Sequence, residues 1–117
     1  MTRFTTTFSP WYGLSRRPMN VIPCSVLDVS DSAAVTRCAA DIEKRHGRID
    51  ILVASAGTNP GKRHLKTMSL EGWDEVVKIN LNGLFYSCYA VIPGMRARKD
   101  GLIINISSWA GRFPSIL

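Results

Sequence analysis

The most constraining stretch of this sequence runs from Gly101 to Gly111, Gly-Leu-Ile-Ile-Asn-Ile-Ser-Ser-Trp-Ala-Gly. Four branched apolar residues within five positions predict a β-strand that is buried on both faces, as in a parallel sheet. Two hydroxyl side chains, Ser107 and Ser108, follow directly and should lie where this strand ends. Because ligands of open α/β sheets bind at the carboxyl ends of the strands, we expect a functional residue there rather than a packing residue.

Two further apolar segments predict strands earlier in the chain. One runs from Val21 to Val29 and should end at Asp28, and the other runs from Ile49 to Ala54. Between them, Ser30 or Asp31 should cap a helix with apolar residues at helical spacing, and Gly47 should end it. A longer helical pattern begins at Ser69 and should end at Asp100-Gly101. Strands that alternate with helices predict a parallel sheet with right-handed crossovers.

The composition restricts the class of protein. A chain of 117 residues, 45% of them hydrophobic, suits one globular domain but is too short for both halves of a dinucleotide-binding sheet. The net charge of +6 is scattered without a nucleic-acid motif, so we expect no nucleic-acid partner. No apolar run approaches the roughly 20 residues of a membrane span, so we expect no membrane partner. The three cysteines and two histidines form no ligand set, which predicts no metal site and a reducing, cytoplasmic location.

Residues 1–20 differ from the rest because they contain no acidic residue. Their aromatic residues fall at helical spacing and are accompanied by arginines, a pattern typical of a mitochondrial targeting segment. Pro10 and the threonines weaken such a helix, so a disordered tail or a foreign start joined to the domain is the other interpretation. We therefore predict an atypical segment over residues 1–20 and a partial dinucleotide-binding domain over residues 21–117.

Several motifs occur together in a fixed order between Asn20 and Pro114. They are Leu27-Asp28-Val29-Ser30-Asp31, Ile49-Asp50-Ile51-Leu52-Val53 running into Ala56-Gly57, Trp73, Asn80 with Gly83, and Gly101 to Gly111. This series resembles the middle of a short-chain dehydrogenase/reductase. The resemblance implies an α/β fold with three strands of a Rossmann-like, doubly wound parallel sheet, without its first two strands and its C-terminal third. It also implies NAD or NADP as cofactor.

The resemblance assigns cofactor-binding roles to two turns. Asp28 would accept a hydrogen bond from the adenine amine, and Val29 would offer its backbone amide; the alternative is a strand end that only leads into a helix cap. The family's second turn, here Ala54 to Gly57, borders the ribose and the nicotinamide, so Ala54, Ala56 and Gly57 are candidates as well. The alternative there is a plain tight turn. The family usually has two asparagines at the positions of Ala54 and Ser55, and one of them connects neighbouring strands by side-chain hydrogen bonds. Because both amides are lost here, this connection is in doubt.

The resemblance implies two catalytic candidates. Asn80 matches the asparagine that bends its helix and holds a water in the proton relay, and the alternative is a purely structural kink. Ser108 matches the serine that hydrogen-bonds the substrate carbonyl, whereas Ser107 is expected to satisfy nearby backbone groups. The substrate would be a small carbonyl compound or a secondary alcohol.

The 117 residues contain neither a Tyr-x-x-x-Lys pair nor a Gly-x-x-x-Gly-x-Gly turn. The family uses the first for proton transfer and the second to hold the cofactor's pyrophosphate. We therefore expect a truncated chain or an incomplete gene model, inactive by itself, with a parent enzyme that transfers hydride. The alternative is a non-catalytic fragment that pairs with a full-length relative, or with a second copy, through the helix from Leu81 to Met95. Strands left without neighbours predict marginal stability, aggregation or pairing with another chain.

Overall fold

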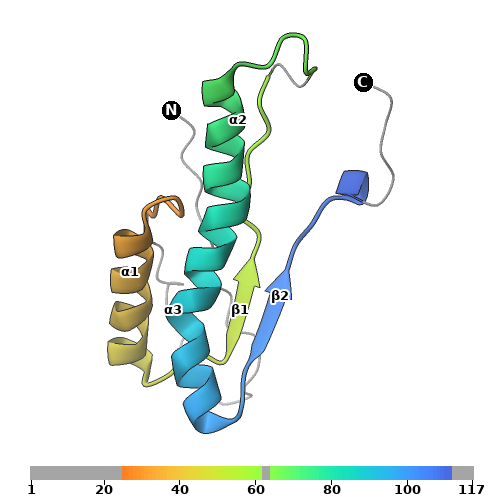
Figure 1. Ribbon diagram of the computed structural model, residues 1–117. Coiled ribbons are helices and arrows are strands. Elements are labelled where there is room, and N and C mark those ends of the chain that lie inside the picture. Colours follow the sequence, from red (N-terminus) through yellow and green to blue (C-terminus); the bar gives the residue numbers. More distant parts are fainter. Residues whose placement is uncertain (1–24, 62–63, 112–117) are drawn as a thin grey trace, which may run out of the picture.

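The computed structural model describes residues 25–61 and 64–111. Two parallel strands, β1 (Ile51–Ala54) and β2 (Leu102–Asn105), form the sheet, paired from Ile51 opposite Leu102 to Ala54 opposite Asn105. Helices α1 (Ser32–His46) and α3 (Gly83–Arg98) pack against each other and run antiparallel to the strands (Figure 1). The predicted α/β class with a parallel sheet is confirmed. The predicted segment over residues 1–20 lies outside the described residues.

Helix α1 begins and ends where the sequence predicts. The Asp31 side chain accepts a hydrogen bond from the Ala34 amide at 3.0 Å and caps the first turn. Gly47 ends the helix with a φ of 86°, a left-handed conformation that favours glycine, and its amide donates to Glu43 O at 2.7 Å. Apolar residues of α1 then face α3 and β1 at helical spacing.

Asp31→Ala should destabilise the chain by about 1 kcal/mol, because the substitution leaves a helix N-terminal amide without its partner. Urea unfolding followed by circular dichroism measures this change. The control is Ser32→Ala, which alters an exposed residue of the first turn whose hydroxyl caps no amide in the described residues. Equal stabilities for the two variants would show that this cap contributes nothing.

The second helical region consists of three consecutive segments rather than one uniform helix. Helix α2 (Leu70–Val76) starts at Ser69, whose hydroxyl accepts from the Gly72 amide at 3.0 Å. A π-helical segment (Val77–Asn82) follows and leads directly into α3. Helix α3 ends at Arg98, with Lys99 in the left-handed conformation, two residues before the predicted end.

The core lies on one face of the sheet only. Five residues from α1, α3 and the β1 segment form the buried cluster, namely Ala39, Ile49, Leu52, Val91 and Met95. On the other face, Ile51 and Val53 are 47% and 39% exposed, and Leu102 and Ile104 are 50% and 39% exposed. The prediction that the strand after Gly101 is buried on both faces is therefore wrong for this chain. Its apolar composition suits a covered sheet, but α1 and α3 lie on one side of it.

The third predicted strand, residues 21–29, is not formed in its described part. Residues 25–28 have no strand hydrogen bonds, and residues 21–24 lie outside the described residues. A strand exists only where a neighbour completes its ladder, and the sheet formed by the described residues consists of β1 and β2. In the Rossmann strand order 3-2-1-4-5-6, the third and fourth strands are not neighbours, so β1 is not the partner of this segment.

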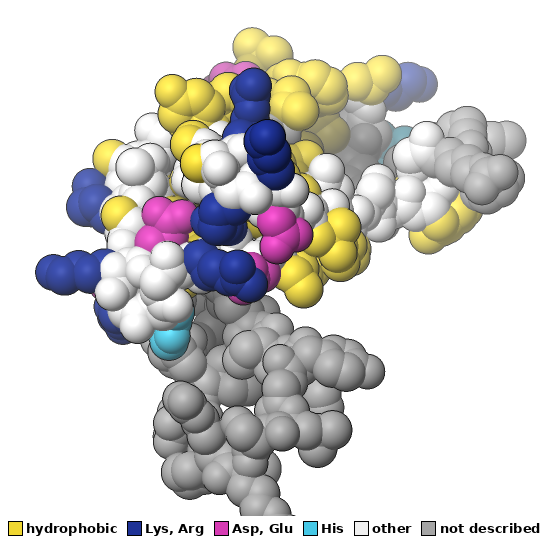
Figure 2. Space-filling model, turned by 90° about the horizontal axis from the view of Figure 1, so that it is seen from below, with side chains coloured by type: hydrophobic (Ala, Val, Ile, Leu, Met, Phe, Trp, Pro, Cys, Tyr) yellow, Lys and Arg dark blue, Asp and Glu magenta, His cyan; other side chains and the backbone are white. Residues whose placement is uncertain are grey.

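Both helices end at the same side of the molecule, opposite the carboxyl ends of the strands. The last turns carry basic residues, Lys44, Arg45 and His46 on α1 and Arg96 and Arg98 on α3. Figure 2, seen from this side, shows Lys and Arg side chains interleaved with Asp and Glu. Positive charge near helix C-termini is favourable because the helix dipole is negative there. These basic residues therefore have a structural explanation.

Within the described residues, no helix is long and apolar enough to cross a membrane.

Candidate functional site

The side chain of Asn80 connects the π-helical segment to the turn after β1. Its Oδ1 accepts a hydrogen bond from the Thr58 amide at 2.7 Å, and its Nδ2 donates to Thr58 O at 2.9 Å. The two bonds use both the oxygen and the nitrogen of the Asn80 side-chain amide. Both partners are backbone groups of Thr58, which lies 22 positions away in the sequence. This pair fixes the helix and the turn relative to each other.

Gly57 lies directly against this connection. A Cβ added to Gly57 would be 3.5 Å from Asn80 Oδ1, an ordinary van der Waals contact. The Asn80 side chain thus lies along the backbone of the turn that contains two of the predicted cofactor-binding residues, Ala56 and Gly57. The role of Asn80 in a proton relay stays a prediction, because these contacts concern its side chain and a backbone.

The ends of β1 and β2 are held together by backbone hydrogen bonds. Ala54 is paired with Asn105, and Ala54 O accepts from the Ile106 amide at 2.9 Å. The family's asparagine side chains are replaced here by Ala54 and Ser55, yet the two strand ends remain adjacent through the main chain. The turn from Ala54 to Gly57 therefore begins from a fixed point beside the end of β2.

The predicted adenine-side residues lie at the turn before α1. Asp28 is exposed, and its Oδ1 accepts from the Ser30 amide at 2.9 Å. Hydrogen bonds from Ser30 lower the pKa of the Asp28 carboxyl below its usual value, against a smaller opposing effect of desolvation. Val29 is 8% exposed and packs against Gly83, the first residue of α3. Asp28 faces a shallow region lined by Glu71, Asp74, Glu75 and Lys78.

The lowered pKa of Asp28 gives a pH prediction. A carboxyl whose folded pKa is depressed contributes stability above its unfolded pKa, and this contribution is lost as the pH falls through the folded pKa. Asp28→Asn keeps an oxygen acceptor for the Ser30 amide but removes the titration. Urea unfolding at several pH values between about 5 and 2 should therefore show a shallower acid decline for Asp28→Asn. Asp74→Asn is the matched control, and an unchanged acid decline in Asp28→Asn would contradict the prediction.

Ser108 lies just beyond β2, where the sequence places it. It is exposed, its Oγ accepts from the Ala110 amide at 3.2 Å, and its carbonyl oxygen accepts from the Gly111 amide at 3.1 Å. These contacts start the short 3-10 helix Trp109–Gly111. The hydroxyl hydrogen is not used in the described contacts and can still donate to a ligand.

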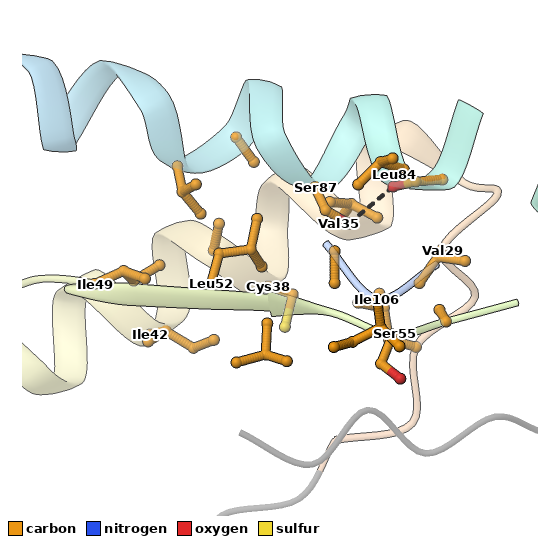
Figure 3. Close-up of a pocket in the computed structure, with 18 of the residues that line it drawn as sticks. Val29, Val35, Cys38, Ile42, Ile49, Leu52, Ser55, Leu84, Ser87 and Ile106 are labelled. Atoms are coloured by element: carbon orange, nitrogen blue, oxygen red, sulfur yellow. Dashed lines mark hydrogen bonds between the residues drawn. The ribbon is translucent and has the colours of Figure 1, made fainter. Parts of the chain in front are cut away.

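A cavity of about 70 Å³ brings several of the predicted residues together. Val29, Ala54, Ala56 and Asn80 all contribute to its walls, whereas Asp28, Gly57 and Ser108 do not. Most other walls are apolar residues of α1, α3 and β1 (Figure 3). The hydroxyl of Ser87 faces the same region and donates to Gly83 O at 2.8 Å.

The described residues contain no group of three or more His, Cys, Asp or Glu side chains that could hold a metal ion.

The family model of short chain dehydrogenases matches residues 16–117. The chain belongs to this family. An NADP-dependent 3-hydroxy acid dehydrogenase from Escherichia coli O6:H1 is 41% identical over 88 residues, which are 75% of this chain and 36% of the relative. An NAD(+)-dependent 2-dehydro-3-deoxy-L-rhamnonate dehydrogenase from Sphingomonas sp. strain SKA58 is 41% identical over 86 residues, 74% of this chain and 34% of the relative.

Solved structures agree with this family assignment. The structure described as ElxO with NADP bound superposes with a TM-score of 0.72 at 28% identity and covers 76% of this chain and 36% of that protein. The chain thus spans about a third of the length of the relatives that it matches. The predicted fold, a part of a Rossmann-like sheet with its helices, is what the shared region contains.

Sequence reasoning missed the residue that anchors Asn80. Thr58 takes part through its backbone amide and carbonyl, so no side-chain motif marks it. The polar Asn80 within an apolar helical pattern is the signal that a partner exists, because an amide in such a helix needs one. The sequence marks Gly83 only as part of the motif with Asn80, and its close contact with Val29 appears only in the packed structure.

Proposed function

We propose that this chain forms the central part of the cofactor and substrate site of an NAD(P)-dependent oxidoreductase. Its parent enzyme would transfer hydride between a nicotinamide cofactor and a carbonyl compound or a secondary alcohol in the cytoplasm. The observation that carries the proposal is the pair of hydrogen bonds between the Asn80 side chain and the Thr58 backbone. It holds the glycine turn after β1 in place, in a chain that belongs to the short-chain dehydrogenase family.

Each candidate residue would contact a different part of the cofactor or the substrate. The small residues Ala56 and Gly57 would allow the ribose and the nicotinamide to approach the turn closely. Asp28, whose carboxyl pKa is lowered by the hydrogen bonds from Ser30, would accept a hydrogen bond from the adenine amine, and the Val29 amide would donate one to the ring. Ser108 would donate its hydroxyl hydrogen to the substrate carbonyl beside the end of β2. The cofactor supplies the hydride when it is bound.

The choice between NAD and NADP stays open in this proposal. The matched relatives include one named for NADP and one named for NAD(+). The pyrophosphate cradle and the Tyr-x-x-x-Lys pair are absent from the 117 residues, so these residues by themselves are proposed to be inactive.

A chimera tests the proposed roles. The 88 matched residues of the 3-hydroxy acid dehydrogenase are replaced by those of this chain, and NADPH oxidation with the relative's own substrate is followed by absorbance. We expect an active chimera in which Ser108→Ala lowers kcat by about 100-fold, the loss typical of removing one preorganised donor to a reacting oxygen. Ser107→Ala is the matched control and should change kcat little. A folded, cofactor-binding chimera in which both serine variants keep full activity would contradict the role of Ser108.

A second candidate function rests on the outer face of α3 and of the π-helical segment before it. Leu81 in that segment and Phe85 and Tyr89 in α3 are 61%, 60% and 66% exposed and follow one another at helical spacing. The Phe85 ring lies near those of Tyr86 and Tyr89, with centroid distances of 6.0 and 5.8 Å. An apolar, aromatic stripe of this kind is typical of a protein interface. We propose that this face pairs with the corresponding helix of a relative or of a second copy.

Phe85→Glu tests the helix-pairing proposal, because it places a charge in the middle of the stripe. Light scattering after size-exclusion chromatography should show an oligomer for the unaltered chain and a smaller species for Phe85→Glu. Thr36→Glu, on the exposed side of α1, should leave the mass unchanged. A monomeric, monodisperse unaltered chain that also fails to co-purify with a co-expressed relative would rule this function out.

A further inference from the structure

Asn82 and Gly83 form the only asparagine–glycine pair among the 117 residues. In such a pair the backbone nitrogen of the glycine can attack the side-chain carbonyl carbon of the asparagine, because glycine has no side chain that hinders the approach. The pair lies at the junction between the π-helical segment and α3, two residues after Asn80. A reaction at this position would therefore alter the backbone beside the candidate site.

The backbone of the junction opposes this attack. Asn82 has φ and ψ of −68° and −38°, and Gly83 has −60° and −40°, so both residues are helical. Ring closure requires the Gly83 nitrogen to lie in one plane with Cβ and Cγ of Asn82, which means that ψ of Asn82 must leave the helical region. In addition, the Gly83 amide donates to Lys78 O, at the five-residue spacing of a π-helix. The attacking nitrogen is therefore held in a hydrogen bond and directed away from its target.

Packing around Gly83 gives the backbone no room to rotate. Gly83 is buried, and a Cβ at this position would lie 2.8 Å from Val29 Cγ2 and 3.2 Å from Val29 O. The described contacts include no hydrogen bond that holds the side-chain amide of Asn82, which makes no cap. The obstacle to the reaction thus lies in the backbone and its packing and not in the reacting side chain.

The connection between Asn80 and Thr58 holds this backbone in place. The Asn80 side chain makes two hydrogen bonds to Thr58, and Asn80 lies between Lys78, which supplies the acceptor for Gly83, and the Asn82–Gly83 pair. If the connection opens, the π-helical segment can unwind and release the Gly83 amide. Local opening of one segment generally requires less free energy than unfolding of the whole chain.

We propose that Asn82 is a deamidation site that the Asn80–Thr58 connection keeps closed. After opening, the Gly83 nitrogen bonds to Cγ of Asn82, the Cγ–Nδ2 bond breaks, and the Gly83 amide proton leaves with the nitrogen as ammonia. Water then adds to one of the two carbonyl carbons of the resulting imide and opens the ring to aspartate or isoaspartate. This modification is independent of the oxidoreductase chemistry proposed above.

The isoaspartate product prevents the junction from closing again. Its main chain contains one additional carbon, because Cβ and Cγ of residue 82 now lie in the backbone. The added length displaces Gly83, which fits beside Val29 only at its present distance. Opening of the Asn80–Thr58 connection is thereby converted from a reversible fluctuation into a permanent change at the candidate site.

Deamidation of the unaltered chain gives the first test. The purified chain is incubated in a mildly alkaline buffer with and without unfolding guanidinium chloride, and the tryptic peptide from Ile79 to Arg96 is weighed by mass spectrometry. Digestion in heavy-oxygen water marks any deamidation that occurs during preparation. Asn82 should react at least severalfold more slowly in the folded chain. Asn105, which precedes the branched Ile106, is the internal control and should react slowly in both samples. Equal rates at Asn82 would overturn the proposal.

A matched pair of variants tests the role of the connection. Asn80→Ala should accelerate deamidation of Asn82 under folding conditions by about 30-fold, which is the effect of two lost hydrogen bonds on an opening equilibrium. Gly47→Ala is the control, because it strains the left-handed end of α1, where a Cβ has open space around it, without contacting the junction. It should change the rate at Asn82 little. Equal acceleration by the two variants, or none by Asn80→Ala, would overturn the proposal.

The unaltered chain decides the question if Asn80→Ala loses its helical circular dichroism. Deamidation of Asn82 is then measured at increasing guanidinium chloride concentrations below the unfolding midpoint. Local opening predicts that the rate rises before the helical signal decreases. A rate that rises only in proportion to the loss of the helical signal would overturn the proposal.

Discussion

Asn80→Ala should destabilise the chain by about 2 kcal/mol, because it removes two hydrogen bonds whose net worth is about 1 kcal/mol each. The bonds to Thr58 connect the π-helical segment with the turn after β1, so their loss frees both. Urea unfolding measures the stability. Hydrogen exchange of the Thr58 amide, read by NMR, should accelerate by more than the global destabilisation accounts for, because its acceptor is gone.

Asn82→Ala is the control for this prediction. Asn82 lies in the same segment, two residues away, and its side chain makes no capping hydrogen bond. Its substitution should leave the exchange rate of the Thr58 amide unchanged. Equal effects of Asn80→Ala and Asn82→Ala would mean that the connection to Thr58 does not hold the turn.

Gly83→Ala should destabilise the packing of α3 on the turn before α1. A Cβ at this position would lie 2.8 Å from Val29 Cγ2 and 3.2 Å from Val29 O, and the neighbouring Val29 is itself buried. Overpacking of this kind costs about 1 to 3 kcal/mol. Alanine also has a helix propensity about 1 kcal/mol better than that of glycine, which offsets part of the cost.

Gly94→Ala in the same helix removes this ambiguity. A Cβ there would approach Glu43 Oε1 and Arg98 Nη1, the ends of flexible side chains that can move aside. Since the propensity gain is common to both variants, their difference in stability isolates the contact with Val29. We expect Gly83→Ala to be about 2 kcal/mol less stable than Gly94→Ala in urea unfolding. Identical stabilities would contradict the tight contact.

Local features of this fold could be predicted from the sequence because their causes are local. Asp31, Gly47 and Ser69 act on backbone groups within a few residues, so the helix ends follow from residue type and spacing. The apolar runs likewise predict β1 and β2, and the motif order predicts the family.

Features that depend on neighbours could not be predicted in the same way. The run after Gly101 has the composition of a fully covered strand, but coverage depends on which elements reach its second face. The segment 25–29 has the pattern of a strand end, but a strand needs an adjacent partner. The partner of Asn80 is a backbone residue 22 positions away, so its identity appears only in the folded chain.

We propose that these 117 residues hold part of an oxidoreductase site, and they contain neither a Tyr-x-x-x-Lys pair nor a Gly-x-x-x-Gly-x-Gly turn. The most direct test is a fluorescence titration of the purified 117-residue chain with NADH and NADPH, followed by assays with simple ketones and secondary alcohols. We predict no turnover and no saturable binding in the micromolar range. Micromolar binding accompanied by turnover would contradict the account.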